Sequence, residues 1–411
     1  MNDKDLYRKI LGIHTPWGVQ KVELDKEEGE IRIHVEHGGR RRLTCPTCGK
    51  ACPGYDSRQR RWRHLDTCQY RTILVADMPR VECGEHGVLQ VRAPWAEAGS
   101  RFTALFEALV LDWLHEASIQ AVARQLNLSW SAVDGIMQRG VDRGEARRER
   151  RAPTRLLVDE TSFRKRHDYV TVVSDGVTRV VLHVAVDRRQ SSLQDYLETL
   201  SEDERSNLES ISMDMWQAYI TAAREALPDA DDKICFDKFH VAKHLGEAVD
   251  KVRRQEHKTL RQEGDTRLLG TKYHWLTNPR NMSGKRRRDF RALRDSNLKT
   301  ARAWAIKETA MSLWDYDSMG WAKRAWTKWL SWAVRSRLDP ILKTAKMIRK
   351  HLPGILNAIV LKVTNAGAES INSRIKMIKV RCRGFRNKTR FQRAILFYLG
   401  GLNVYPDTSK P

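Results

Sequence analysis

The stretch Thr154-Arg-Leu-Leu-Val-Asp159 is a short apolar run that ends in a carboxylate. Glu209-Ser-Ile-Ser-Met-Asp214 has the same character and the same ending. Apolar runs of this length predict strands, and a third acid, Glu369, opens a basic segment that we expect to be helical. The three acids therefore mark the ends of two predicted strands and the start of one predicted helix.

These acids lie in a strongly basic protein of 411 residues, with 74 Lys+Arg, 51 Asp+Glu and a formal net charge of +23. Carboxylates that converge repel one another, and divalent cations relieve that repulsion. We expect Asp159 and Asp214 to be neighbours in a sheet whose first and fourth strands pair. A site for two Mg²⁺ (or Mn²⁺) ions in a basic protein indicates phosphodiester chemistry on nucleic acid. Spacing alone does not assign the site, because 51 acids offer many such sets.

The composition also limits the class of protein. The length predicts two to four domains. The N-terminal residues 1–8 lack the apolar region of a secretory signal, and no uncharged apolar run reaches the roughly 18 residues of a membrane span. We therefore expect a cytoplasmic, nucleoid-associated protein with reduced thiols and no membrane partner. A basic protein that does not bind nucleic acid is the alternative.

Two short motifs predict a structural zinc site. Each places two ligands three positions apart and ends in glycine: Cys45-Pro-Thr-Cys48-Gly49 and Cys83-Gly-Glu-His86-Gly87. Two such turns held by strands form a zinc ribbon with tetrahedral ligation. The predicted ligands are Cys45, Cys48, Cys83 and His86. Zinc would contribute to folding, because a domain this small lacks a sufficient core. Cys52 and Cys68 are alternative ligands, and a redox pair is the alternative for the first motif.

Residues 118–137 predict a helix-turn-helix. Ser118 and Ser129 are suited to cap two short helices, and Asn127 is suited to the turn between them. The second helix would enter the major groove of double-stranded DNA. Its outward residues are predicted to be Trp130, Ser131, Asp134 and Gln138. A plain helical hairpin is the alternative, and the basic composition favours DNA binding.

Changes of periodicity along the chain predict a multidomain α+β protein. Residues 19–36 alternate as a β-hairpin does, and the basic stretch 58–64 is predicted to be a loop that contacts phosphates or solvent. A charged connector, 143–151, precedes early strands that then alternate with helices, which predicts a mixed sheet with helices packed on it. The predicted domains are 1–95 with the hairpin and zinc ribbon, 100–142 with the helix-turn-helix, 154–240 with the sheet, 241–360 with helices only, and 361–411 with the helix of Glu369.

Region 241–360 is also rich in tryptophan, and both it and region 361–411 are rich in basic residues. The tryptophans of 241–360 are predicted to be mostly core, and Trp314, Trp321, Trp329 and Trp332 fit one helical stripe. Stacking of one or two of them on an unpaired base is the alternative. A dense basic run follows Glu369 and predicts salt-dependent contact with a DNA backbone. Its residues include Arg374, Lys376, Lys379, Arg383 and Arg386.

Several local motifs together resemble the ISL-three (ISL3) family of bacterial insertion-sequence transposases. The resemblance covers nearly the whole chain, including the zinc ribbon and the helix-turn-helix. The motifs in the second half are Val158-Asp-Glu-Thr-Ser-Phe163, Tyr169-Val-Thr-Val-Val-Ser-Asp175, Asp214-Met-Trp-Gln-Ala-Tyr219, Phe236-Asp-Lys-Phe-His-Val241, Asn365-Ala-Gly-Ala-Glu-Ser-Ile-Asn372 and Arg383-Gly-Phe-Arg-Asn387.

The resemblance implies a ribonuclease-H-like mixed α/β catalytic core, in two parts, with a helical insertion between them. The implied DDE triad is Asp159, Asp214 and Glu369. Asp237 and His240 look like an accessory motif near the scissile phosphate, whereas a satisfied histidine at a helix start is the alternative. The neighbouring Glu160 is expected to point to the opposite face of its strand.

The implied function is that of a DNA transposase. It would bind the terminal inverted repeats of an insertion sequence, cleave a strand with Mg²⁺ or Mn²⁺, and join the freed 3′-OH to target DNA. Two ends must be held together, so a homodimer or a larger homo-oligomer is expected. A non-catalytic DNA-binding regulator or domesticated transposase, and a structure-specific nuclease with the same core, are the alternatives.

Overall fold

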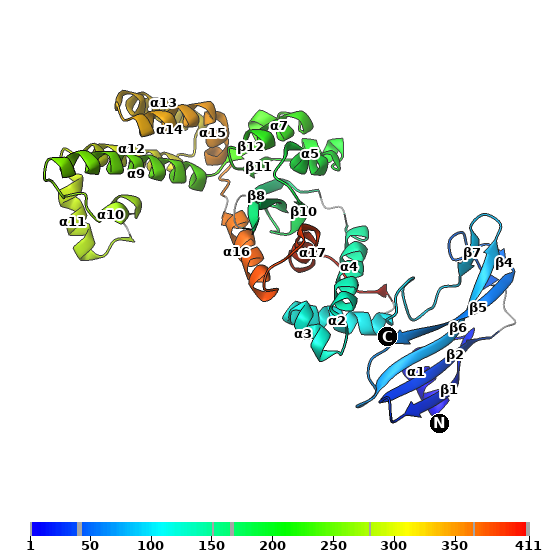
Figure 1. The fold of residues 1–411 in the computed structure, drawn as a ribbon. Helices are drawn as coiled ribbons and strands as arrows, with labels where there is room; N and C mark the ends of the chain where they lie inside the picture. Colours follow the sequence, from blue (N-terminus) through cyan, green and yellow to red (C-terminus); the bar gives the residue numbers. More distant parts are fainter. Residues whose placement is uncertain are drawn as a thin grey trace. The chain divides into compact units, whose positions relative to one another are not determined.

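The computed structural model of the protein describes residues 2–38, 43–149, 152–164, 168–278, 281–364 and 366–407 (Figure 1). Residues 150 and 151 of the predicted connector, and Asn365 of the motif before Glu369, lie outside them. The chain divides into two compact units. The first comprises Met1–Glu149 with Leu402–Pro411, and the second comprises Arg150–Gly401.

A sheet with the strand order β1-β2-β6-β5 organises the first part of unit 1, and β7 also pairs with β6. Its strands are β1 (Trp17–Asp25), β2 (Glu30–His37), β5 (Gly54–Arg63), β6 (Arg71–Cys83) and β7 (Gly87–Gln90), and helix α1 (Asp3–Ile10) precedes them. The predicted hairpin is confirmed, because β1 and β2 pair antiparallel. The loop predicted at 58–64 is wrong. Most of it belongs to β5, because antiparallel pairing with β6 continues to Arg63. The side chain of Trp62 is thereby buried in a core with Trp17 and Trp95.

The helix-turn-helix is formed by α3 (Ile119–Gln125) and α4 (Trp130–Ala146), after helix α2 (Ala104–Glu116). Both predicted caps are confirmed: Ser118 Oγ accepts from Ala121 N at 3.3 Å, and Ser129 Oγ accepts from Ala132 N at 3.2 Å. Asn127 lies in the turn between the two helices and has φ 51°. This is the left-handed region, which asparagine tolerates better than most residues. The second helix is longer than predicted and continues nine residues beyond Met137.

The additional residues of α4 pack against the C-terminal segment of the chain. Residues 402–407 group with unit 1, whereas the sequence had assigned 361–411 to the region of Glu369. Val404 is buried, and its carbonyl accepts from Arg143 of α4. Gly144 leaves room for the segment, because a Cβ there would lie 2.7 Å from the Cβ of Leu402. The second half of α4 is therefore a packing surface for the end of the chain.

Unit 2 is built on a mixed sheet with the order β10-β9-β8-β11-β12. Its strands are β8 (Arg155–Arg164), β9 (Asp168–Asp175), β10 (Val181–Ala185), β11 (Ser210–Met213) and β12 (Ile234–Phe236). Strands β8, β9 and β10 pair antiparallel, and β8, β11 and β12 pair parallel. The predicted pairing of the first strand with the fourth is confirmed. The interpretation that Asp159 ends its strand is wrong, because pairing with β9 carries β8 on to Arg164.

Helices cover both faces of this sheet (Figure 1). Helices α5 (Gln190–Glu198) and α7 (Gln217–Ala226) lie on one side, and α16 (Ala366–Arg381) and α17 (Lys388–Leu399) lie on the other. Two short helices, α6 (Glu202–Ser206) and α8 (Ala230–Lys233), precede β11 and β12. Unit 2 therefore has a three-layer centre, and its acids lie where strands meet helices.

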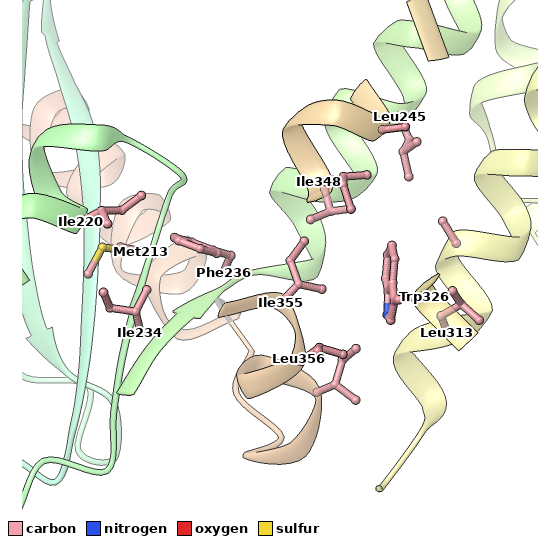
Figure 2. Packing of buried hydrophobic residues seen from close by; sticks show 14 of the residues in the cluster. Met213, Ile220, Ile234, Phe236, Leu245, Leu313, Trp326, Ile348, Ile355 and Leu356 are labelled. Carbon is pink, nitrogen blue, oxygen red and sulfur yellow. The ribbon is translucent and has the colours of Figure 1, made fainter. Parts of the chain in front are cut away.

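The predicted all-helical region is confirmed in the described residues between β12 and α16. Its elements are α9 (Lys238–Gln262), α10 (Lys272–Leu276), α11 (Gly284–Arg294), α12 (Lys299–Ser312), η2 (Leu313–Asp315), α13 (Met319–Arg335), α14 (Asp339–Lys350) and α15 (Leu352–Val360). One apolar core joins it to the sheet, with Met213, Phe236 and Ile355 in a continuous path toward Trp326 (Figure 2). Gly354 permits that contact, because a Cβ there would lie 2.6 Å from the Phe236 ring.

Most tryptophans of this region belong to the core or pack against it, as predicted: Trp275, Trp304, Trp314, Trp326 and Trp329. Trp275, Trp326 and Trp329 are buried, whereas Trp321 is 62% exposed and Trp332 is 38% exposed. The predicted stripe is wrong for Trp321 and Trp332, because the buried face of α13 runs through Ala322, Trp326, Trp329, Leu330 and Ala333. Trp321 and Trp332 are eleven residues apart, about 20° in helical projection, so they share one solvent-exposed face of α13.

No helix within the described ranges is long and apolar enough to cross a membrane.

Candidate active site, zinc site and DNA-contact residues

Asp159 and Asp214 lie side by side because of the parallel pairing of β8 with β11. Leu157 and Ser212 are the last paired residues of the two strands. Asp159 lies two positions after Leu157, and Asp214 lies two positions after Ser212. Asp159 Oδ1 accepts from Glu160 N at 2.8 Å, and Asp214 Oδ1 accepts from Met215 N at 2.7 Å. These local bonds fix both carboxylates at the carboxyl end of the parallel part of the sheet.

The electrostatics of this pair are unfavourable without a cation. The pKa of Asp159 is raised to about 6, mainly by burial and also by the neighbouring carboxylates of Glu160 and Asp214. Among the described residues, neither Asp159 nor Asp214 forms an ion pair with a lysine or arginine. The nearest basic group to Asp214 is His240, whose Nδ1 lies 3.5 Å from Oδ1. Hard oxygen ligands without a fixed counter-charge are what Mg²⁺ and Mn²⁺ bind, so these residues fit a divalent cation.

Glu160 belongs to a different network. Arg188 Nε donates to its Oε1 at 2.6 Å, and Arg188 also lies 4.3 Å from the Trp216 ring centroid. The pKa of Glu160 is raised by burial, and Arg188 offsets part of that rise. Asp159, by contrast, contacts α16 through Asn372. The two adjacent acids therefore face different partners, as the alternation of a strand requires.

The accessory pair is divided between two tasks. Asp237 is buried and caps α9, because its carboxylate accepts from Phe239 N at 3.0 Å. His240 lies in the first turn of α9 and contacts Asp214. The structure thus brings His240 to the acid pair, while Asp237 fixes the start of the helix that carries it.

Glu369 lies in the first turn of α16, and its side chain is exposed. The structure does not bring Glu369 to ligand distance of the other two acids. Within the described ranges, the Cys/His cluster is the one group of three or more side chains whose ligand atoms are close enough to share a metal ion. The residue of α16 that does reach the pair is Asn372, whose Nδ2 donates to Asp159 Oδ2 at 2.7 Å. Sequence reasoning gave Asn372 no role. The signal was its position three residues after Glu369, which places both on one helical face.

Glycine allows α16 to approach β8 closely. A Cβ on Gly367 would lie 2.8 Å from Leu157 Cδ1 and still closer to the Arg179 guanidinium. Behind Gly367, the buried side chains of Ile371 and Ile375 hold the helix on the sheet. The first turn of α16 is therefore positioned by packing rather than by a loop.

The zinc ligands are gathered as predicted. The ligand atoms of Cys45, Cys48, Cys83 and His86 all lie within 4.8 Å of one another. Cys48 Sγ is 3.8 Å from Cys83 Sγ, and Cys83 Sγ is 3.5 Å from His86 Nδ1. A Zn–S bond of about 2.3 Å in a tetrahedron gives an S···S edge of about 3.8 Å. The four residues therefore fit Zn²⁺, and Cys52 and Cys68 fall outside the set.

The zinc ribbon holds its ligands on two turns. The two-stranded sheet of β3 (Leu43–Thr44) and β4 (Ala51–Cys52) supports the first, and the β6–β7 turn supports the second. Backbone N–H groups of Glu85 and His86 lower the pKa of the Cys83 thiol to about 7. A thiol so placed is readily a thiolate, which is the form that binds metal.

The residues predicted to contact DNA are not all available for it. On α4, Ser131 is exposed and Trp130 and Gln138 are half-buried, away from the buried Val133 and Ile136. On and after α16, Arg374, Lys376, Arg383 and Arg386 are exposed. Lys379 differs, because its Nζ donates to Ser162 O at 2.6 Å, and burial lowers its pKa. Lys379 therefore contributes to the docking of α16 on β8.

These features define a class: a multidomain protein with a helix-turn-helix, a thiolate metal site and an acid pair on a mixed sheet. Comparison with known proteins identifies the family. A family model described as a transposase matches residues 156–395. A model of the helix-turn-helix domain of transposase family ISL3 matches residues 91–141, and a model of the zinc-finger of transposase IS204/IS1001/IS1096/IS1165 matches residues 41–86.

Individual relatives align over most of their length. The transposase for insertion sequence element IS1001 of Bordetella parapertussis is 28% identical over 392 residues, which is 93% of this chain and 95% of the relative. The transposase for insertion sequence element IS1557 of Mycobacterium tuberculosis (strain CDC 1551 / Oshkosh) is 26% identical over 418 residues, with 94% and 93% covered. The chain belongs to the ISL3 family of insertion-sequence transposases.

Proposed function

We propose that the protein is a DDE transposase that binds the terminal inverted repeats of an insertion sequence and catalyses strand cleavage and strand transfer. The observation that carries the proposal is the pair of Asp159 and Asp214, which lie side by side without a lysine or arginine among the described residues to balance them. The mixed sheet, with three antiparallel strands beside two parallel ones and helices on both faces, supports a ribonuclease-H-like core.

In this proposal Asp159, Asp214 and Glu369 hold Mg²⁺ or Mn²⁺, in a site for two ions. Such ions, when bound, activate the attacking oxygen and stabilise the leaving oxygen of the phosphodiester. The chain supplies two fixed carboxylates from strands and a third from the first turn of α16. That third carboxylate is exposed, so a change of rotamer or a small movement of the turn brings it in when DNA and cation bind.

His240 has a supporting role in the same proposal. Its Nδ1 faces Asp214 Oδ1 at 3.5 Å, so the ring limits the positions open to that carboxylate. Asp237 acts through the cap of α9, which sets the orientation of His240. We assign the pair to positioning the acid site rather than to direct proton transfer.

DNA recognition is assigned to several surfaces, which also define our proposed division of the chain. The zinc ribbon in 1–95 and the helix-turn-helix in 100–142 recognise the repeat, with Trp130, Ser131 and Gln138 of α4 toward the groove. In unit 2 the exposed cations near the active site contact the DNA backbone. Their electrostatic contribution to DNA affinity weakens as the salt concentration rises. These cations are Arg374, Lys376, Arg383 and Arg386.

The helical insertion, 241–360, offers a further contact in the same proposal. The solvent face of α13 carries Trp321 and Trp332, together with Arg324, whose guanidinium lies 5.3 Å from the Trp321 ring centroid. Exposed aromatic rings beside cations can stack on unpaired bases. Because two element ends must be processed together, we propose that the active form is a homodimer or larger.

The test is cleavage of a DNA duplex that carries the inverted repeat and its flank. Asp159→Asn should abolish Mg²⁺-dependent cleavage and leave binding to the repeat within about twofold of wild type, because the charge is lost without change of shape. Asp203→Asn, an exposed acid of α6, is the matched control and should cleave normally.

Three outcomes would count against the proposal. Cleavage by Asp159→Asn would exclude the triad. Repeat binding by a wild-type protein that never cleaves, in any divalent metal, would indicate a DNA-binding regulator. Cleavage of branched DNA regardless of the repeat would indicate a structure-specific nuclease.

A further inference from the structure

Asn372 joins α16 to β8 through its amide nitrogen. Its Nδ2 donates to Asp159 Oδ2 at 2.7 Å and to the carbonyl oxygen of Glu160 at 3.4 Å. Both neighbours are acceptors. The opposite orientation of the amide would place Oδ1 against two oxygens, so the network fixes which end of the side chain faces β8.

The same orientation leaves Oδ1 of Asn372 buried with no hydrogen-bond partner. A buried acceptor without a hydrogen-bond partner is destabilising, so a residue retained for packing alone would be better apolar. Amide oxygens are ligands or hydrogen-bond acceptors in sites for hard divalent cations. The free Oδ1 therefore indicates a side chain whose environment is completed when the cation and its water arrive.

Docking of α16 does not depend on Asn372. The helix is held on β8 by the buried Ile371, Ile375 and Ile378, and by the bond from Lys379 Nζ to Ser162 O. Removal of the amide should therefore leave the helix in place while it releases the Asp159 carboxylate. This separates a role in the site from a role in the fold.

We propose that Asn372 is a positioning residue of the active site, which holds the Asp159 carboxylate in the geometry that binds the divalent cation. Glu369, one turn earlier on the same face of α16, is presented to that cation by the packing of the helix on β8. The inference rests on the proposed function, because it assigns Asn372 to the same metal site. Hydrogen-bond partners of metal ligands typically change metal affinity or activity 10–100-fold when removed.

The experiment uses the full-length protein with Asn372→Leu, which matches the size of the side chain and removes the amide. Mn²⁺ binding, followed by electron paramagnetic resonance without DNA, should weaken about 10–100-fold. The Mg²⁺ concentration for half-maximal cleavage should rise by a similar factor, while the KM for repeat DNA stays unchanged. Ser373→Ala, the exposed neighbour whose Oγ bonds only within α16, is the matched control and should behave as wild type.

Thermal unfolding distinguishes a purely structural role. If Asn372→Leu lowers the melting temperature and weakens DNA and Mn²⁺ binding together, the inference is overturned. Asn372→Ser gives the same test if the leucine variant does not fold, because it is small and cannot reach Asp159. Wild-type Mn²⁺ binding and metal dependence in a folded variant also overturn the inference.

The inference and the proposed function can fail separately. If Asp159→Asn is inactive and Asn372→Leu behaves as wild type, only the role of Asn372 is lost. If Asp159→Asn cleaves DNA normally, the proposed function itself is lost.

Discussion

Replacement of Glu107 by alanine tests how the DNA-binding helices are held together. Glu107 lies in α2, is 1% exposed, and joins three neighbours. Its carboxylate accepts from Ser100 Oγ at 2.7 Å, from Arg139 Nε at 3.0 Å and from Arg143 Nη2 at 3.3 Å. Both arginines belong to α4, so this one carboxylate ties α2 to the helix that carries the proposed recognition residues.

The expected loss follows from what remains after the substitution. Breaking a buried ion pair by removing one partner costs about 3–5 kcal/mol. Arg143 keeps a bond to Glu97 Oε1 at 2.6 Å and another to Val404 O, and Arg139, whose side chain is 30% exposed, can regain water. The loss should therefore lie near about 3 kcal/mol, which is about 100-fold in an equilibrium constant.

Hydrogen exchange measured by mass spectrometry on peptides from 104–146 resolves this loss locally. A global unfolding curve would mix two units and would not be two-state. Protection of α2 and α4 should fall about 100-fold in Glu107→Ala, and it should not change in Glu116→Ala, an exposed acid at the end of the same helix. Protection within about twofold of wild type in Glu107→Ala would refute the reasoning.

Three further predictions concern unit 1. Cys45→Ser should remove the bound zinc and the protection of the ribbon, and an unchanged zinc content by native mass spectrometry would exclude this ligand. Burial lowers the pKa of His64 to about 4 from 6.5, so the unfolded chain binds the proton first, and stability is lost as the pH falls from 6.5 toward 4. The loss should reach about 2 kcal/mol at pH 5, measured by hydrogen exchange on peptides that contain His64, and it should vanish in His64→Gln. Gly144→Ala should release the C-terminal segment to proteolysis, because its Cβ meets Leu402, whereas Gly135→Ala, which meets only a flexible arginine end at 3.6 Å, should not.

The part of the site that the sequence predicts well is the part encoded by local pattern. The zinc ligands follow from spacing, because two turns with fixed separation can be recognised without the fold. The two short strands β11 and β12 are buried throughout. Strand β11 pairs with β8, which places Asp214 beside Asp159, and β12 pairs with β11. Burial of whole strands is a strong local signal.

The features that the sequence did not predict depend on long-range contact. The residues that follow Asp159 are polar, so only pairing with β9 reveals that the strand continues. The contact of Asn372 with Asp159 spans more than 200 positions, and asparagine in a helix has no motif of its own. The return of the C-terminal segment to α4 is encoded in small residues such as Gly144, which indicate a close approach but not its partner.

The central claim is that Asp159, Asp214 and Glu369 converge on one divalent-cation site. Fe²⁺ replaces Mg²⁺ at oxygen-ligand sites, and with peroxide it cuts the polypeptide near the bound ion. We predict cuts beside Asp159 and Asp214 in the free protein, with an added cut beside Glu369 when repeat DNA is bound, and suppression of all three by excess Mg²⁺. Cuts confined to other segments, or cuts at these positions that persist in the double variant Asp159→Asn, Asp214→Asn, would contradict the account.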